Sequence, residues 1–196
     1  MTWKYSSDAD RSKYLDKIKG LKVIDIGGAT SFADGHLNAI IDFNEPLAKA
    51  TNIFKGNINL PEVWQEVSTH VKKNGLFDYA ICTHTIEDIS NPFFVCREIE
   101  KIAKAGLIIV PSKYTEFHRW SHFRGFIHHR WIFDVIEGQF TGFPKINYIE
   151  HPKFDNKNGE SELVIEWEGK INLNIINNDF LGPDNAAVES YYDKLL

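Results

Sequence analysis

Cysteine is scarce in this chain, because Cys82 and Cys96 are the only two among its 196 residues. Two cysteines exclude a disulfide scaffold and a cysteine-only zinc site, so we expect a reducing compartment, the cytoplasm. No run of sequence approaches the roughly 18 to 20 consecutive apolar residues of a membrane-spanning helix. The segment from Met1 to Lys22 lacks an apolar h-region, so no secretory signal is expected.

Basic residues are also in deficit. The chain has 22 lysines and arginines against 27 aspartates and glutamates, which gives a formal net charge of −5. This balance argues against binding to nucleic acid or to a membrane surface through net charge. With 43% hydrophobic and 25% charged residues, the composition is that of a globular protein. A chain of this length buries about 70% of its unfolded surface, so residues 1–196 are expected to form one domain.

Short apolar runs alternate with helical patterns through the first 112 residues. Pro61 begins one predicted helix, which Asn74 and Gly75 end, and Asn91-Pro92 begins another that is expected to end at Gly106. This alternation predicts βαβ units, a mainly parallel sheet and right-handed crossovers. The runs interpreted as strands are Leu21–Gly27, Asn38–Phe43, Asn52–Ile58, Phe77–His84 and Leu107–Pro111.

The last third of the chain has a different pattern. Apolar and polar residues alternate on both sides of a Glu168-Gly169-Lys170 turn, which predicts an antiparallel hairpin in which residue 167 pairs with 171. Lys145–His151 is expected to be a further strand beside it. The predicted fold is therefore α/β, a Rossmann-like three-layer sandwich whose mainly parallel twisted sheet ends in antiparallel strands. The apolar hairpin residues are Leu163, Ile165, Trp167, Ile171, Leu173 and Ile175.

Four loops follow the predicted parallel strands, and ligands of open α/β sheets bind at the carboxyl ends of such strands. Asp25 with Gly27 and Gly28 lies in the first loop. Asp42 ends the second strand, where a carboxylate can accept both hydroxyls of a ribose. The remaining two loops are Gly56–Ile58 and Thr83–Asp88.

Four motifs in this half of the chain resemble the successive motifs of class I S-adenosylmethionine-dependent methyltransferases. They are Val23–Ala29, Ile41–Phe43, Phe77–Pro92 and Ala105–Pro111, and the likeness covers roughly residues 20–112. The block 77–111 is similar to the small-molecule and sugar-modifying branch of that superfamily. The resemblance implies a methyltransferase-like fold, with 20–112 as the cofactor-binding half and 113–196 on the acceptor side.

The resemblance also implies which residues hold S-adenosylmethionine, with S-adenosylhomocysteine as the product. Asp25, Gly27 and Gly28 would contact the amino-acid part of the cofactor, and Ala29 takes the family's second glycine position. The other implied contacts are Asp42 with the ribose, Asn57 and Ile58 with the adenine, and Thr83 and His84 with the sulfonium side.

Several positions depart from the family pattern. Ala29 and Ser31 replace the later two glycines, and Asn57 stands where an aspartate is common. Asp25 and Asp42 are 17 positions apart, so the intervening helix must be short. Purely structural roles are also open for these residues. Asp25 with Gly27 and Gly28 could form a tight turn, and Asp42 could cap the turn at Glu45. His84 and Glu87 could equally be the first residues of a helix.

The segment from Phe117 to Phe133 holds much of the aromatic surplus, four histidines and three arginines, without an acidic residue. As a lid, it would offer aromatic faces and arginines to an anionic or sugar-bearing acceptor. As a metal site, His118 and His122 have i, i+4 spacing, and His128-His129 would add a ligand. No carboxylate or cysteine partner is evident, so we assign no metal. As plain structure, Trp131, Ile132 and Val135 would form the buried face of a helix.

These patterns predict a methyltransferase with an unidentified small-molecule or sugar-type acceptor. A hydroxyl acceptor needs a base, for which His84 is the first candidate and His118 the second. The alternative is a catalytically inactive methyltransferase-like domain that binds a ligand or a partner. The sequence does not indicate an oligomeric state. The candidate acceptor-binding residues are Glu87, Tyr114, Arg119, His122, Arg124, His128 and Arg130.

Overall fold

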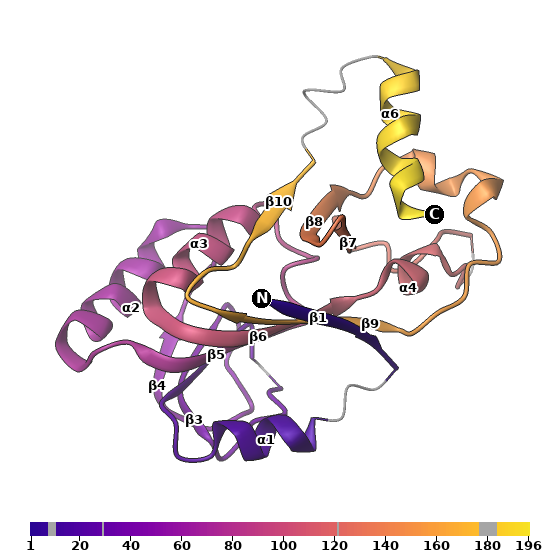
Figure 1. Ribbon diagram of the computed structural model, residues 1–196. Helices are drawn as coiled ribbons and strands as arrows, with labels where there is room; N and C mark the ends of the chain where they lie inside the picture. Colours follow the sequence, from indigo (N-terminus) through magenta and orange to yellow (C-terminus); the bar gives the residue numbers. More distant parts are fainter. Residues whose placement is uncertain (8–10, 29, 121, 177–183) are drawn as a thin grey trace.

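A computed structural model describes residues 1–7, 11–28, 30–120, 122–176 and 184–196. Its strands form a seven-stranded sheet of order β1-β9-β6-β5-β2-β3-β4 and a three-stranded sheet of order β10-β8-β7 (Figure 1). The strands are β1 Thr2–Ser6, β2 Val23–Ile26, β3 Leu37–Asp42, β4 Ala50–Lys55, β5 Phe77–Thr83, β6 Ala103–Pro111, β7 Trp131–Ile136, β8 Gln139–Pro144, β9 Glu162–Glu168 and β10 Leu173–Ile175. The helices are α1 Ser12–Ile18, α2 Pro61–Asn74, α3 Pro92–Ile102, α4 Lys113–Phe117, α6 Asn185–Tyr192 and the short 3₁₀ turns η1 Asn147–Glu150, η2 Pro152–Phe154 and η3 Asp193–Leu195.

The large sheet confirms the predicted Rossmann-like fold class. Strands β4, β3, β2, β5 and β6 are parallel, whereas β9 runs antiparallel to β6 and β1 antiparallel to β9. Because the chain crosses from β4 back to β5, the strand order reverses between β2 and β5. The crevice at such a reversal is where open α/β sheets bind ligands.

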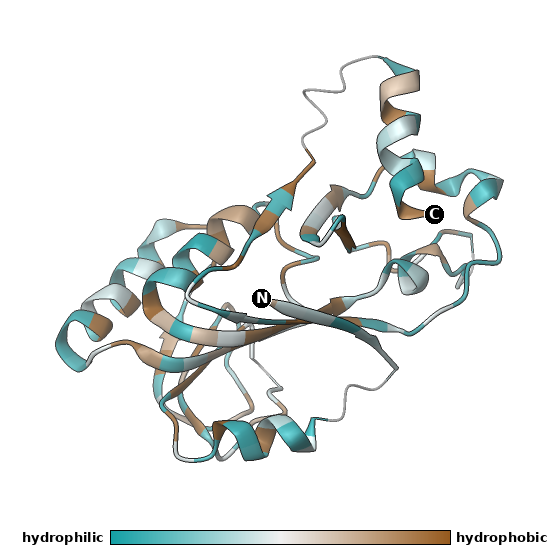
Figure 2. Ribbon diagram, in the orientation of Figure 1, coloured by the Kyte–Doolittle hydropathy of each residue, from teal (hydrophilic) through white to brown (hydrophobic). Residues whose placement is uncertain are grey.

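The two faces of the large sheet form separate parts of the core. Val23 packs on one face with Tyr14 and Ile18 of α1, whereas Ile24 and Ile26 pack on the other with α2 and α3. Figure 1 shows α1 on one side of the sheet and α2 with α3 on the other. In Figure 2 the ribbon of α1 is mostly hydrophilic, as expected of a helix that buries only one face. The arrangement is the three-layer sandwich that the strand–helix alternation predicts.

The small sheet packs on the α2–α3 side of the large one, since Phe133, Phe140 and Leu173 belong to the same core as Ile108 of β6. A further apolar cluster, which contains Phe117, joins α4 to the C-terminal helix. No helix in the described parts of the chain has the length and apolar character that crossing a membrane requires.

The predicted hairpin is wrong. Strand β9 pairs with β6 on one edge and β1 on the other, so neither edge is left for β10. Strand β10 pairs instead in parallel with β8, with Leu173 opposite Phe140. The apolar pattern correctly predicted which side chains are buried, because Leu163, Ile165 and Trp167 share one core with Ile171 and Leu173. It predicted the wrong partner strand for β10.

Four local predictions are also corrected. Lys145–His151 contains η1 rather than a strand, because Ile146 and Ile149 are spaced for a helical turn that packs against Phe154. Trp131–Ile136, expected as a helix in one interpretation, forms strand β7 paired with β8. Helix α3 ends at Ile102, before Gly106. Turns over residues 32–35 replace the short helix expected after Gly28.

Candidate functional site

The loop after β2 is built on two glycines. Gly27 has a φ of +75°, and a Cβ there would lie 2.3 Å from the Thr85 hydroxyl oxygen. A Cβ on Gly28 would lie 2.4 Å from Cγ of Asp25. The chain's own packing therefore requires glycine at both positions, as the tight-turn interpretation expects.

Asp25 is a fully buried acid at the end of β2. It has no exposed surface, and neither carboxylate oxygen has a hydrogen-bond partner among the described residues. Burial raises the pKa of Asp25 to about 7, with a contribution from the negative charge of Asp42 and against the effect of the nearby Ser31 hydroxyl. An unsatisfied buried carboxylate is costly, and a cationic or hydrogen-bond-donating ligand would satisfy it.

A cavity of about 290 Å³ lies over this loop. Gly27, Gly28, Thr83 and His84 line it, so it lies where β2 and β5 end and the strand order reverses. These four residues come from two of the loops singled out in the sequence, and they line the same cavity. The remaining lining residues are Arg11, Thr30, Ser31 and Phe32.

The residues expected to hold the nucleoside lie at the same edge of the sheet but are engaged locally. Asp42 ends β3, and its Oδ1 accepts a hydrogen bond from the Asn44 backbone N–H at 2.7 Å. This contact is close to the alternative role of Asp42 as a cap for the turn at Glu45. Asn57 is exposed, and Ile58 belongs to the core. None of the three lines the 290 Å³ cavity. Ala29 lies outside the described residues.

His84 is held between two acids. Its Nε2 lies 2.8 Å from Oε1 of Glu162, and its Nδ1 lies 3.6 Å from Oε1 of Glu87. These contacts, first that with Glu162 and then that with Glu87, raise the pKa of His84 to about 9. His84 is therefore an imidazolium near neutral pH and acts as a hydrogen-bond donor, which argues against the general-base role predicted for it.

His84 also lines a second cavity, of about 430 Å³. Glu87 is almost fully buried in its wall, and burial raises the pKa of that carboxyl. The lining combines carboxylates, imidazoles and two exposed aromatic rings, which are Trp120 and Phe126. The full lining is His84, Glu87, Asp88, Pro111, Thr115, Trp120, Phe126, His128, His129, Ser161 and Glu162.

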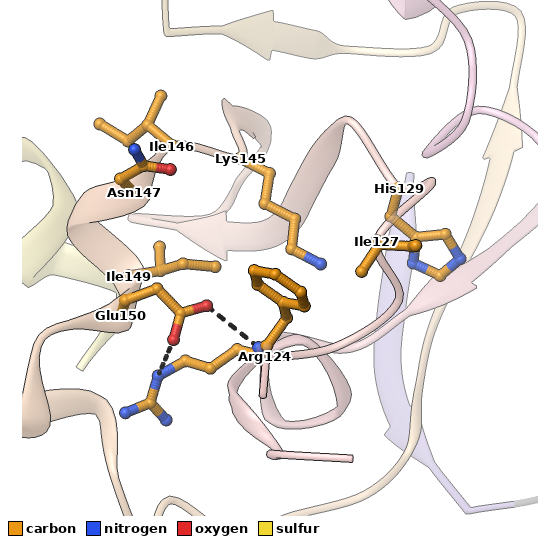
Figure 3. A pocket seen from close by; sticks show the side chains of 9 residues that line it. Arg124, Ile127, His129, Lys145, Ile146, Asn147, Ile149 and Glu150 are labelled. Carbon is orange, nitrogen blue, oxygen red and sulfur yellow. Dashed lines mark hydrogen bonds and ion pairs between the residues drawn. The ribbon is translucent and has the colours of Figure 1, made fainter. Parts of the chain in front are cut away.

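Two of the arginines predicted to bind an anionic acceptor are engaged elsewhere. Arg124 is 1% exposed, and its guanidinium donates to the carbonyl oxygens of Phe117 and Phe154 at 2.7 and 3.1 Å. Figure 3 shows its pairing with Glu150, in the wall of a neighbouring cavity of about 320 Å³. Arg119 pairs with the same Glu150 at 2.7 Å. Neither arginine lines the 430 Å³ cavity.

The other predicted acceptor residues divide into three groups. Glu87 and His128 line the 430 Å³ cavity. Tyr114 and the second base candidate, His118, line a separate cavity of about 240 Å³. His122 and Arg130 are exposed and line none of these cavities.

Several residues of the second cavity were not among the predicted acceptor-binding residues. Glu162 and Asp88 supply two of its carboxylates, and His129 is buried with its Nδ1 2.6 Å from Oε1 of Glu116. Lys145 lies 2.7 Å from the other oxygen of Glu116. Local spacing carries no signal for these contacts, because each joins segments that are distant in the sequence.

No family model and no curated protein matches the chain. Among solved structures, it is similar to the methyltransferase domain of bacterial CtHen1-CN, at 14% identity and a TM-score of 0.43, over 80% of this chain and 94% of that one. It is also similar to an S-adenosylmethionine-dependent methyltransferase from Mesorhizobium loti, at 13% identity and a TM-score of 0.44, over 81% and 97%. A third similar structure is the N-terminal domain of EvdMO1 with S-adenosylhomocysteine bound, at 12% identity and a TM-score of 0.40, over 97% and 72%.

Proposed function

We propose that this protein is an S-adenosylmethionine-dependent methyltransferase acting on a small-molecule or sugar-type acceptor. The observation that carries the proposal is the buried Asp25 carboxylate, which has no hydrogen-bond partner among the described residues and lies behind Gly27 and Gly28, two residues that line the cavity where β2 and β5 end. A buried acid next to an open backbone suits a ligand with an ammonium group. The motif resemblance over residues 20–112 supports S-adenosylmethionine as that ligand.

The residues present fit the amino-acid end of this cofactor. Asp25 would hold its ammonium group, the backbone of Gly27 and Gly28 would face its carboxylate end, and Thr83 would lie beside its sulfonium. Asp42 remains the candidate for the ribose. When bound, the cofactor supplies an electrophilic methyl group. Transfer from a sulfonium removes positive charge, so a site that excludes water and aligns the acceptor contributes most.

The second cavity is proposed as the acceptor site. His84 borders both cavities, which supports an acceptor site next to the proposed cofactor crevice. Its imidazolium would donate a hydrogen bond to an acceptor oxygen, and the carboxylates of Glu87 and Glu162 would accept from hydroxyl groups. Trp120 and Phe126 offer apolar faces. This lining suits a neutral polyhydroxylated ring better than an anion, since Arg119 and Arg124 are engaged elsewhere.

Cofactor binding is the decisive experiment. In a thermal-shift assay, S-adenosylmethionine or S-adenosylhomocysteine at about 100 times its dissociation constant should stabilise the fold by about 2.7 kcal/mol. Asp25→Asn keeps the shape of the side chain but removes its charge, and should abolish most of the shift. Asp16→Asn, at an exposed position of α1, is the matched control and should leave the shift unchanged.

Two local contacts motivate a second candidate function. The Thr85 side chain fills the space beside Gly27, and the Asp42 carboxylate already accepts a backbone hydrogen bond. Both observations suit a catalytically inactive methyltransferase-like domain that binds another ligand or a partner. The absence of any shift with either compound at millimolar concentration would favour that alternative and reject the enzyme.

A further inference from the structure

Two histidines and an aspartate converge on the wall of the 430 Å³ cavity. Oδ1 of Asp88 lies 3.7 Å from Nε2 of His129 and 3.9 Å from Nε2 of His128. The three ligand atoms all lie within 4.8 Å of one another. We infer that Asp88, His128 and His129 bind one divalent transition-metal ion, of which Zn²⁺ is the representative.

The donor set suits such an ion. Two imidazole nitrogens and one carboxylate oxygen are borderline ligands that Zn²⁺, Co²⁺, Fe²⁺ and Mn²⁺ accept, whereas Mg²⁺ prefers oxygen ligands alone. Ligand atoms about 2.1 Å from a tetrahedral zinc are about 3.4 Å apart. The Asp88 oxygen is within about 0.5 Å of that spacing from each imidazole. The widest separation in the cluster, at most 4.8 Å, requires an approach of up to about 1.4 Å. His128 is largely exposed and can turn to do so.

The Asp88 carboxylate has an oxygen available. Its Oδ1 is shielded from solvent and has no hydrogen-bond partner among the described residues, although it faces both imidazoles. A shielded acceptor without a donor is unusual in a folded protein. A cation between Asp88, His128 and His129 would satisfy it.

The buried histidine is already oriented as a metal ligand. His129 Nδ1 lies 2.6 Å from Oε1 of Glu116, and donation of the Nδ1 hydrogen to this carboxylate leaves Nε2 as a lone-pair donor toward Asp88. Lys145 lies 2.7 Å from Oε2 of Glu116 and holds the acid in turn. In Figure 3 the Lys145 ammonium points toward the segment of Ile127 and His129. A carboxylate behind a ligating histidine is the common arrangement at protein metal sites.

The backbone fixes the two segments next to each other. The N–H groups of Arg130 and Trp131 donate to the carbonyl oxygen of Glu87, at 2.7 and 3.2 Å. This contact brings the histidine pair beside Asp88, which follows Glu87 in the turn after β5. Three protein ligands leave one tetrahedral position open to the cavity, for water or a ligand oxygen.

The test is metal titration of tag-free protein stripped with a chelator. Wild-type protein should bind one equivalent of Zn²⁺ and of Co²⁺, the latter with a visible absorption spectrum, and should not bind Mg²⁺. Asp88→Asn and His128→Ala should each weaken Zn²⁺ binding at least about tenfold. His122→Ala should leave it unchanged, because this exposed histidine belongs to the i, i+4 pair with His118 and lies outside the cluster.

Glu116→Gln tests the positioning residue. It should weaken Zn²⁺ binding about 10- to 100-fold while one cobalt ion still binds, with a changed spectrum. Thermal unfolding of each variant checks that it folds. If Glu116→Gln fails to fold, His128→Ala still tests the site, because His128 is exposed. Absence of saturable Zn²⁺ and Co²⁺ binding, or equal affinity in wild type, Asp88→Asn and His128→Ala, would overturn the site.

The proposed metal site does not depend on methyl transfer. The titration contains no S-adenosylmethionine, and Asp25 plays no part in it. Zinc binding without a thermal shift by S-adenosylmethionine would support the metal site and reject the proposed function. A thermal shift without zinc binding would support the proposed function and reject the metal site.

Discussion

His84 shows how a tertiary contact changes the chemistry of a residue. Near the ordinary pKa of histidine it would be a base, but Glu162 from β9 and Glu87 hold it as an imidazolium, with a pKa raised to about 9. The same two acids make His84 part of the folded structure as well as of the proposed site. Its protonation is therefore linked to stability.

This linkage gives a prediction for stability against pH. Because the folded-state pKa lies above the unfolded value of 6.5, the contribution of His84 is fully present below about pH 6.5 and is lost as pH rises through about 9. Since its side chain is 44% exposed, solvent screening reduces the effect to about 1 kcal/mol. Urea unfolding of wild type and His84→Asn at pH 6 and pH 10 measures it.

Asparagine is the suitable replacement because it tolerates the positive φ of 48° at this position better than most residues. The wild type should exceed the variant in stability at pH 6 by about 1 kcal/mol more than it does at pH 10. The same difference at both pH values would show that the imidazolium does not contribute.

At the scale of elements, helix starts and the parallel strands were predictable. Pro61 and Asn91-Pro92 begin their helices as expected, because proline and side-chain caps act within one turn of the backbone. Strand pairing in the last third was not predictable. The alternation around Glu168 specifies which side chains are buried, but several partners can cover an apolar face, and β6 and β1 occupy both edges of β9.

Gly106 was expected to end a helix but lies inside strand β6. A Cβ at this position would lie 2.3 Å from the carbonyl oxygen of Ala80 and 2.8 Å from Nε1 of Trp167. The glycine therefore permits close packing of β6 between β5 and β9. It is a requirement of the sheet rather than a helix cap.

Gly106→Ala should destabilise the fold by about 3 kcal/mol, because the clash involves the backbone of a neighbouring strand. Gly20→Ala is the control: its added methyl meets nothing within 4 Å, and only the φ of +79° opposes it, at a cost of about 1 kcal/mol. Urea unfolding measures both. Equal losses would mean that the sheet adjusts to the methyl group and that packing at Gly106 is not restrictive.

For the whole molecule, the two sheets share one hydrophobic core. Phe133 and Phe140 of the small sheet pack in the same cluster as Ile108 and Ile165 of the large one. A shared core couples the folding of its parts, which supports the proposal that 1–196 is a single domain.

Unfolding should accordingly be a single cooperative transition. Far-ultraviolet circular dichroism and tryptophan fluorescence should give coincident curves, since Trp167 lies in the large sheet and Trp131 in the small one. Trp167→Phe removes the fluorescence of Trp167 in the large sheet, and Trp131→Phe removes that of Trp131 in the small sheet. The change that each substitution makes in the fluorescence curve therefore reports on one sheet. Two transitions, each assigned to one tryptophan, would show that the sheets fold independently.

By itself, the sequence determined the parallel sheet, its carboxyl-edge loops and the position of Asp25 beside Gly27 and Gly28. Those features follow from periodicity, glycine and proline, whose effects extend over a few residues. Only the tertiary structure decided that Glu162 reaches His84 and that Asp88 meets the His128-His129 pair. These contacts join segments from different elements, and they depend on how the strands and the small sheet pack rather than on local spacing.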